Sequence, residues 1–157
     1  MRKYISRAAF GAVAVIAASG AQASPVVVDY RGSDAFGPGD LFISEVRYTL
    51  NGVADSSSAG AFQLTGSTDG ASFDFIAYCI DLMNGMEDGV AYHNNPGLLG
   101  MAGTAALDSL ISNAPAIDNA VKAGAFQLAV WDIAYDAENQ DGLGLTDGAF
   151  QATDEGD

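Results

Sequence analysis

Two side chains in this sequence are suited to unusual chemistry, those of Cys79 and Gln127. Cys79 is the only cysteine, so it cannot form an internal disulfide, and its thiol is either reactive, intermolecular or a small buried hydrophobe. A cysteine is intrinsically nucleophilic even when only a few per cent is thiolate at neutral pH. Gln127 lies among apolar neighbours in AGAFQLAVWDIAYD (Ala123–Asp136), and a buried amide without partners costs about 1–3 kcal/mol. Gln127 therefore needs an explanation.

The elements that must position these residues are a strand and a long helix. The segment Phe73–Leu82 is apolar on both faces, which predicts a central strand covered on both sides, with Cys79 near its end and Asp81 close behind. It forms a predicted hairpin with Ala61–Thr65 through the turn residues Gly66–Ser72. The predicted helix has one apolar stripe and a second row of residues beside it. The helix is Ile117–Tyr135, the stripe is Ile117, Val121, Leu128 and Tyr135, and the row beside it is Gln127, Val130, Trp131 and Ala134.

The rest of the chain predicts further strands and one shorter helix. We expect strands at Ser24–Asp29, Leu41–Leu50, Val90–His93 and Leu143–Ala152, and a helix at Thr104–Asn113 with Thr104 as its N-cap. Asn51-Gly52 marks a turn, and the serine-rich Val53–Gly60 reads as a loose connection. Together these elements predict an α+β fold, an antiparallel β-sandwich or barrel-like sheet with a helical insertion that carries the glutamine motif.

The N-terminus has the pattern of a secretory signal peptide. Arg2, Lys3 and Arg7 precede a short apolar run, and Ala21-Gln22-Ala23 fits a cleavage site, so we expect residues 1–23 to be removed and the protein to be exported. The run is too short to span a bilayer. We expect 24–157 to form a single domain, truncated at its C-terminus because no closing element is visible.

The mature chain is strongly acidic. Removal of the signal peptide leaves three basic residues, Arg31, Arg47 and Lys122, against 20 acidic ones. Such a balance argues against nucleic acid as a partner, because that binding depends on Lys and Arg neutralising phosphates. No mature segment is long and apolar enough to cross a membrane.

Two motifs together resemble a known family. Tyr78-Cys79-Ile80-Asp81-Leu82 followed by Gln127-Leu128-Ala129-Val130-Trp131 resembles the thioester domains of bacterial surface proteins, which pair a Tyr-Cys strand motif with a Gln-x-Ala-[Ile/Val]-Trp helix motif. The longer pattern looks most like the version in exported PEP-CTERM-type proteins of Gram-negative bacteria, and it covers roughly residues 73–136. Phe126 stands where the Gram-positive pattern usually has threonine.

The resemblance implies a bond between the Cys79 sulfur and the Gln127 side-chain carbonyl, formed with loss of ammonia. Phe75, Tyr78 and Trp131 would shield this thioester from water, and Asp81 would orient or tune the cysteine. An amine-bearing surface or matrix partner would then be captured covalently, in adhesion or biofilm attachment. This is a single-use reaction and not enzymatic turnover, and it needs no cofactor or metal.

Three alternatives remain open. A cysteine hydrolase would use Cys79 with His93, the only histidine, although no oxyanion motif accompanies them. The acidic segment Asp136–Gly142 could suggest calcium, but it lacks the ligand spacing of an EF-hand loop. A passive, β-rich exported matrix protein would share every feature except the covalent bond. The sequence AGAFQL occurs twice, at Ala59–Leu64 and Ala123–Leu128, in different periodic contexts, which indicates coincidence and not a duplicated module.

Overall fold

In a computed structural model, the structure describes residues 26–29, 41–84, 90–92, 98–138 and 142–152. The predicted signal peptide lies outside these residues. The described elements are seven strands and two helices, in the following order: β1 (Val26–Asp29), β2 (Phe42–Leu50), β3 (Val53–Gly60), β4 (Phe62–Thr68), β5 (Ala71–Ala77), β6 (Val90–Tyr92), α1 (Gly100–Asn113), α2 (Ala120–Asp136) and β7 (Phe150–Ala152).

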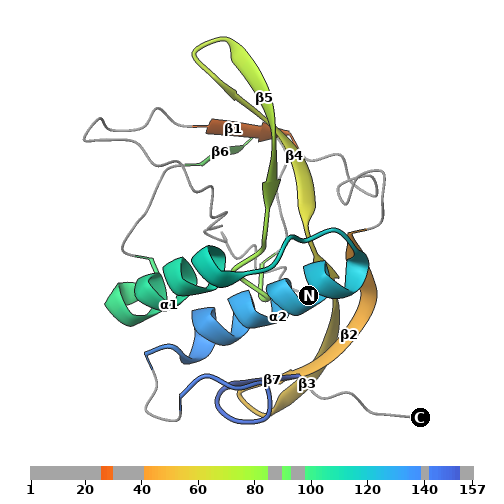
Figure 1. Ribbon diagram of the computed structural model, residues 1–157, viewed down its shortest axis with the longest axis vertical. Coiled ribbons are helices and arrows are strands. Elements are labelled where there is room, and N and C mark those ends of the chain that lie inside the picture. The colour runs from red at the N-terminus through yellow and green to blue at the C-terminus, as the bar shows by residue number, and fades with distance from the viewer. Residues whose placement is uncertain (1–25, 30–40, 85–89, 93–97, 139–141, 153–157) are drawn as a thin grey trace, which may run out of the picture.

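The strands form two antiparallel sheets, so the predicted α+β class is confirmed (Figure 1). One sheet has the order β5-β4-β1-β6 and the other the order β3-β2-β7. The chain crosses from one sheet to the other between β3 and β4, at Ala61, whose N–H donates to the Leu41 carbonyl. In the described part of the chain neither sheet closes on itself, so the arrangement is a two-sheet fold and not a barrel.

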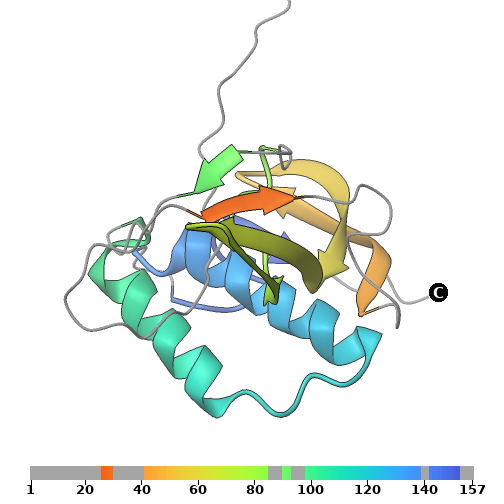
Figure 2. The same ribbon diagram turned by 90° about the horizontal axis from the view of Figure 1, so that it is seen from above.

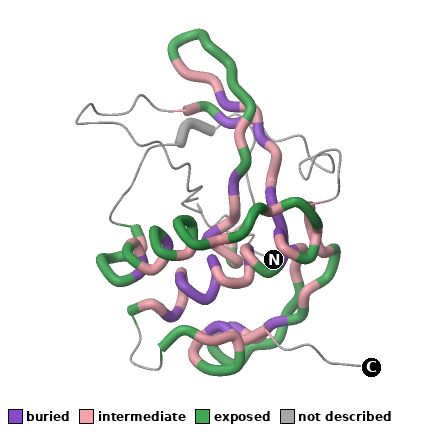
Figure 3. Tube along the Cα trace, viewed as in Figure 1, coloured by how far each residue is buried: buried purple, intermediate pink, exposed green. Residues whose placement is uncertain are grey.

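Helix α2 is the element on which the core is assembled. It packs against β2, β3 and β7 of the three-stranded sheet, and α1 packs beside it (Figure 2). Buried positions therefore concentrate along α2 and the strand segments that face it (Figure 3). The largest cluster of buried side chains joins this helix to the sheet; its members are Tyr48, Leu50, Ala59, Trp131 and Phe150. Burial of such aromatic groups supplies much of the driving force for folding.

The β2–β3 and β4–β5 hairpins each have a turn of two residues with positive φ. Asn51 and Gly52, with φ of 52° and 77°, join β2 to β3, as expected. The prediction that Val53–Gly60 is a loose connection was wrong, because this turn sets a register that pairs the serine-rich segment with β2. The expected Gly66–Ser72 loop is likewise shorter, since Asp69-Gly70 alone makes the turn and the strands continue up to it.

The prediction that Phe73–Leu82 is a central strand was also wrong. Strand β5 ends at Ala77 and lies at the edge of its sheet, paired only with β4 among the described strands. Phe73 and Ile76 are 36% and 55% exposed. The two apolar faces of the segment belong to two different environments, because its second half leaves the sheet and runs to the helices, where Ile80 packs in a cluster with Leu107, Val130 and Ile133.

The helices begin elsewhere than expected. Helix α1 starts at Gly100, so Thr104 is not its N-cap; the Thr104 hydroxyl donates to the Gly100 carbonyl inside the helix. Helix α2 starts at Ala120 and not at Ile117, and Val121, assigned to the apolar stripe, is 71% exposed. No helix of the described residues is long and apolar enough to cross a membrane.

Two buried carboxylates at the end of α2 hold the segment that follows it. The Asp136 side chain is fully buried and accepts the N–H groups of Ala149 and Phe150 at 2.7 and 2.8 Å. Asp132, one turn earlier, accepts the Gly144 N–H at 3.2 Å. These contacts seat β7, which is shorter than the predicted strand Leu143–Ala152 and covers only its last three residues.

Amide substitutions of these two carboxylates should have opposite effects at neutral pH. Burial, and then the nearby charge of Asp136, raise the pKa of Asp132, so its charged form is disfavoured in the fold and stability falls as pH rises above its ordinary value of 3.8. Asp132→Asn keeps an acceptor for Gly144 and should raise the Tm at pH 7 and give no gain near pH 3.

Asp136→Asn should instead destabilise the fold by about 1–3 kcal/mol, because an amide nitrogen cannot accept the second backbone N–H. Thermal unfolding followed by circular dichroism at both pH values measures both effects. A lower Tm for Asp132→Asn at pH 7 would contradict the assignment of a costly buried charge.

Candidate functional site

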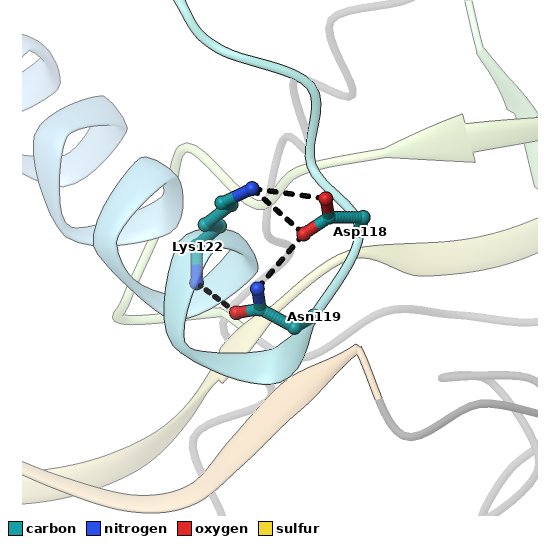
Figure 4. Close-up of polar contacts among 3 residues, drawn as sticks. All are labelled: Asp118, Asn119 and Lys122. Atoms are coloured by element: carbon teal, nitrogen blue, oxygen red, sulfur yellow. Dashed lines mark hydrogen bonds and ion pairs between the residues drawn. The ribbon is translucent and has the colours of Figure 1, made fainter.

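The N-terminus of α2 is fixed by three polar side chains. The Asn119 side chain accepts the Lys122 N–H at 3.0 Å, which is a standard N-cap contact (Figure 4). The Lys122 ammonium contacts both oxygens of Asp118, at 2.8 and 2.9 Å. This hydrogen bond lowers the pKa of Asp118. The amine closest to Gln127 in the sequence is therefore held at the beginning of the helix by an ion pair.

The structure brings Cys79 and Gln127 together. Gln127 lies in the second turn of α2 and is 1% exposed. Its Oε1 atom accepts the N–H of Cys79 at 2.9 Å, and its Nε2 atom donates to the carbonyl oxygen of Cys79 at 2.6 Å. The carboxamide thus pairs with Cys79 at two points, as a neighbouring strand would. The Cys79 N–H also fixes which end of the carboxamide is the oxygen.

The Cys79 thiol is partly buried and has one polar contact of its own. Its Sγ atom donates to the carbonyl oxygen of Asp81 at 3.0 Å. Burial raises the pKa of the thiol above the ordinary value of 9.0, and the Asp81 side-chain charge acts in the same direction, whereas a hydrogen bond with the Asp81 backbone lowers it. The thiol form therefore predominates at neutral pH, and the thiolate is a minor species.

Asp81 forms a turn directly after the cysteine. Its carboxylate accepts the Met83 N–H at 2.8 Å and the Asn84 side-chain amide at 2.6 Å. The hydroxyl of Tyr135, from the last turns of α2, accepts the Leu82 N–H at 2.9 Å and lies 3.5 Å from the Asp81 carboxylate. Burial is the main cause that raises the pKa of Tyr135 to about 12, so its hydroxyl is protonated at physiological pH.

The aromatic residues predicted to shield the site have different positions. The ring of Tyr78 packs against that of Phe126 with centroids 4.5 Å apart, so the residues that precede Cys79 and Gln127 contact each other. Trp131 is 1% exposed in the main core cluster, where it contacts Tyr48 and Phe150. Phe75 packs with the cluster of the four-stranded sheet formed around Val28, Leu64 and Ala77. Tyr78 is thus the predicted shielding residue that contacts α2 beside the pair.

The described geometry gives little support to the cysteine hydrolase and calcium-binding alternatives. His93 lies outside the described residues, as do 139–141 of the proposed calcium segment. Within that segment Asp136 faces the interior, and the Glu138 carboxylate accepts the Ala102 N–H. The described residues contain no group of three His, Cys, Asp or Glu side chains placed to hold a metal ion. As expected, the two AGAFQL copies differ in structure, one spanning β3 and β4 and the other lying in α2.

Sequence reasoning missed two features of the site. The Cys79 backbone, and not only its thiol, contacts Gln127. Tyr135 was assigned to the apolar stripe, but its hydroxyl reaches Leu82. Its spacing of eight residues from Gln127, which places both on similar faces of a helix, is a signal that could have found it. No signal of this kind was available for the backbone contacts.

Comparisons with known proteins return no match. A scan against protein-family models and searches of curated proteins and of solved structures each found nothing significant.

The two-point pairing itself should contribute measurable stability. In a Cys79→Ala background, where no bond to sulfur is possible, Gln127→Leu should cost about 1–3 kcal/mol, because the backbone N–H and carbonyl of residue 79 lose their partners. Gln63→Leu in the same background is the matched control, since Gln63 is the glutamine of the other AGAFQL copy and lies on β4. Urea unfolding measures both; equal effects of the two substitutions would contradict the importance of the pairing.

Proposed function

We propose that this protein is an exported surface or matrix protein in which Cys79 and Gln127 form an internal thioester that captures an amine-bearing partner. The observation that carries the proposal is the two-point pairing of the Gln127 carboxamide with the backbone of Cys79, at 2.9 and 2.6 Å. It holds an electrophilic carbonyl against the residue that bears the only thiol of the chain. The motif resemblance to bacterial thioester domains points to the same pair.

The pairing supports the chemistry in two ways. An amide is a poor electrophile, and holding it beside a nucleophile can be worth roughly 7–11 kcal/mol relative to free encounter. The Cys79 N–H already donates to the Gln127 oxygen, where negative charge develops when sulfur attacks the carbonyl carbon. Cys79 would therefore supply both the nucleophile and a donor for the developing oxyanion.

The proposed reaction balances without a cofactor. The Cys79 sulfur bonds to the Gln127 carbonyl carbon, the carbon–nitrogen bond breaks, and ammonia leaves with the thiol proton. A primary amine later attacks the same carbon, forms an amide with the Gln127 acyl group and returns the proton to the sulfur. Attack by the amine is the reverse of the step in which ammonia leaves. The amine would therefore approach from the side on which Nε2 lies, next to the carbonyl of Cys79. Each molecule reacts once, so the protein is not an enzyme.

Partial burial and aromatic packing favour a stored thioester. Tyr78 and Phe126 pack against each other beside the pair, which limits access of water to the acyl group. Lys122 is the lysine nearest to Gln127 in sequence, and its ion pair with Asp118 holds its amine at the beginning of α2. An external amine would thus meet little competition from this side chain.

A second function is favoured by the same contacts. Both polar ends of the Gln127 carboxamide have partners, so the glutamine is fully accounted for as a structural clamp in a passive matrix module. The two functions differ in one covalent bond. Mass measurement distinguishes them directly.

The mature chain should be lighter than its sequence by one ammonia. Under native conditions its thiol should be silent to iodoacetamide, and methylamine should restore the thiol while adding to Gln127, which peptide mass spectrometry would locate. Cys79→Ala and Gln127→Leu are the controls and should both have full sequence mass. A wild-type chain of full mass with a freely alkylated thiol would leave the structural clamp as the function.

Thioester formation should accelerate with pH. The pKa of Cys79 is raised above its ordinary value of 9.0, chiefly by burial, so the reactive thiolate should increase about tenfold per pH unit throughout the range from pH 6 to 9. The initial rate of ammonia loss by newly synthesised chains, measured by mass between pH 6 and 9, tests this. A rate that levels off below pH 8 would show that thiolate supply does not limit the reaction.

A further inference from the structure

Helix α2 contacts the segment around the cysteine at a second point besides Gln127. The hydroxyl of Tyr135 accepts the Leu82 N–H at 2.9 Å. Gln127 and Tyr135 are eight residues apart on the helix, or about 12 Å at 1.5 Å per residue. Cys79 and Leu82 are three residues apart in the chain. The two contacts together fix this segment along the helix.

Between these contacts lies the group that orients the thiol. The Cys79 sulfur donates to the Asp81 carbonyl at 3.0 Å, and this carbonyl belongs to the peptide bond whose N–H, on Leu82, is bound by Tyr135. The Tyr135 hydroxyl is also 3.5 Å from the Asp81 carboxylate. Because a peptide unit is planar, an anchor on its N–H fixes the direction of its carbonyl.

This anchor has a consequence for the sulfur. A cysteine side chain has three staggered positions about its first torsion, and a single contact to a fixed carbonyl selects one of them. If the Asp81–Leu82 peptide turns, that selection is lost. The backbone pairing of Cys79 with Gln127 would remain, because it does not involve the sulfur.

We propose that Tyr135 is a positioning residue for thioester formation, acting through the Asp81–Leu82 peptide to hold the Cys79 sulfur for attack on Gln127; this rests on the proposed function. The Tyr135 hydroxyl contacts the Leu82 N–H and the Asp81 carboxylate, and its proposed role is to position the sulfur and not to transfer the proton. Its effect is on the rate at which the bond forms.

The test compares Tyr135→Phe with Tyr48→Phe. Tyr48 is a buried tyrosine of the cluster against which Tyr135 packs, and no described contact joins its hydroxyl to residues 79–84, so it controls for loss of a phenol from this core. Full mature chains are synthesised in a cell-free system, and loss of ammonia is followed by intact mass from pH 6 to 9. Circular dichroism and hydrogen exchange of the Leu82 amide are measured on the same samples.

The expected result is that Tyr135→Phe loses ammonia about three- to tenfold more slowly than wild type at every pH, with native circular dichroism and faster Leu82 exchange. Tyr48→Phe should lose it at the wild-type rate. The pH–rate lines of wild type and Tyr135→Phe should be parallel, because both react through the thiolate, whose fraction rises about tenfold per pH unit below the thiol pKa.

Other outcomes overturn the proposal in distinguishable ways. Equal rates for the two variants would leave the thioester intact as a function and remove the role of Tyr135. A pH profile of different shape for Tyr135→Phe would make the phenol a proton-transfer group, and loss of native circular dichroism would make it a folding residue. A wild-type chain that never loses ammonia would overturn the proposed function together with the role of Tyr135.

Discussion

The pairing of the Gln127 carboxamide with the backbone of Cys79 is the contact on which the arrangement of the site depends. A buried carboxamide is costly without partners, and here the chain that leaves β5 supplies a donor and an acceptor from one residue. That segment has left its sheet, so its own backbone groups also need partners. The Gln127 carboxamide and the backbone groups of Cys79 are hydrogen-bond partners of each other, and this contact joins α2 to the segment that follows β5.

The same pairing explains how a buried structural contact can also favour attack of the Cys79 sulfur on the Gln127 carbonyl. A backbone N–H that donates to an amide oxygen in the ground state is a group of the kind that can also stabilise the oxyanion that forms when a nucleophile attacks the carbonyl. The thiol of Cys79 is on the residue that supplies the donor, so folding brings the residue that bears the thiol into contact with the carboxamide.

The sequence was sufficient for the class of fold and for the pair, and insufficient where tertiary contacts decide. Alternation along Leu41–Leu50 and helical periodicity around Gln127 are local properties, and both elements were predicted. The Asn51-Gly52 turn was also recognised, but the pairing that it imposes on the serines of β3 is not a property of those serines. Strand β5 was misplaced at the centre of a sheet because apolar residues on two faces do not reveal that half of the segment packs on helices.

The site residues follow the same division. Cys79 and Gln127 could be named from their types and from a motif, whereas Tyr135 was indistinguishable from the apolar residues of its helix until its hydroxyl was seen to reach Leu82. Gln127, Trp131 and Tyr135 succeed one another at intervals of four, so they lie on adjacent turns of one side of α2.

Trp131, the middle residue of this row, fixes the positions of Gln127 and Tyr135. Trp131 is fully buried, and its indole N–H has no hydrogen-bond partner among the described residues, so packing against Tyr48 and Phe150 is what fixes it. A rigid ring in a close-packed core prevents α2 from rotating about its axis or sliding along it. Gln127 and Tyr135, one turn to either side, are thereby held at fixed positions. In this fold the hydrophobic core sets the geometry of the polar contacts beside it.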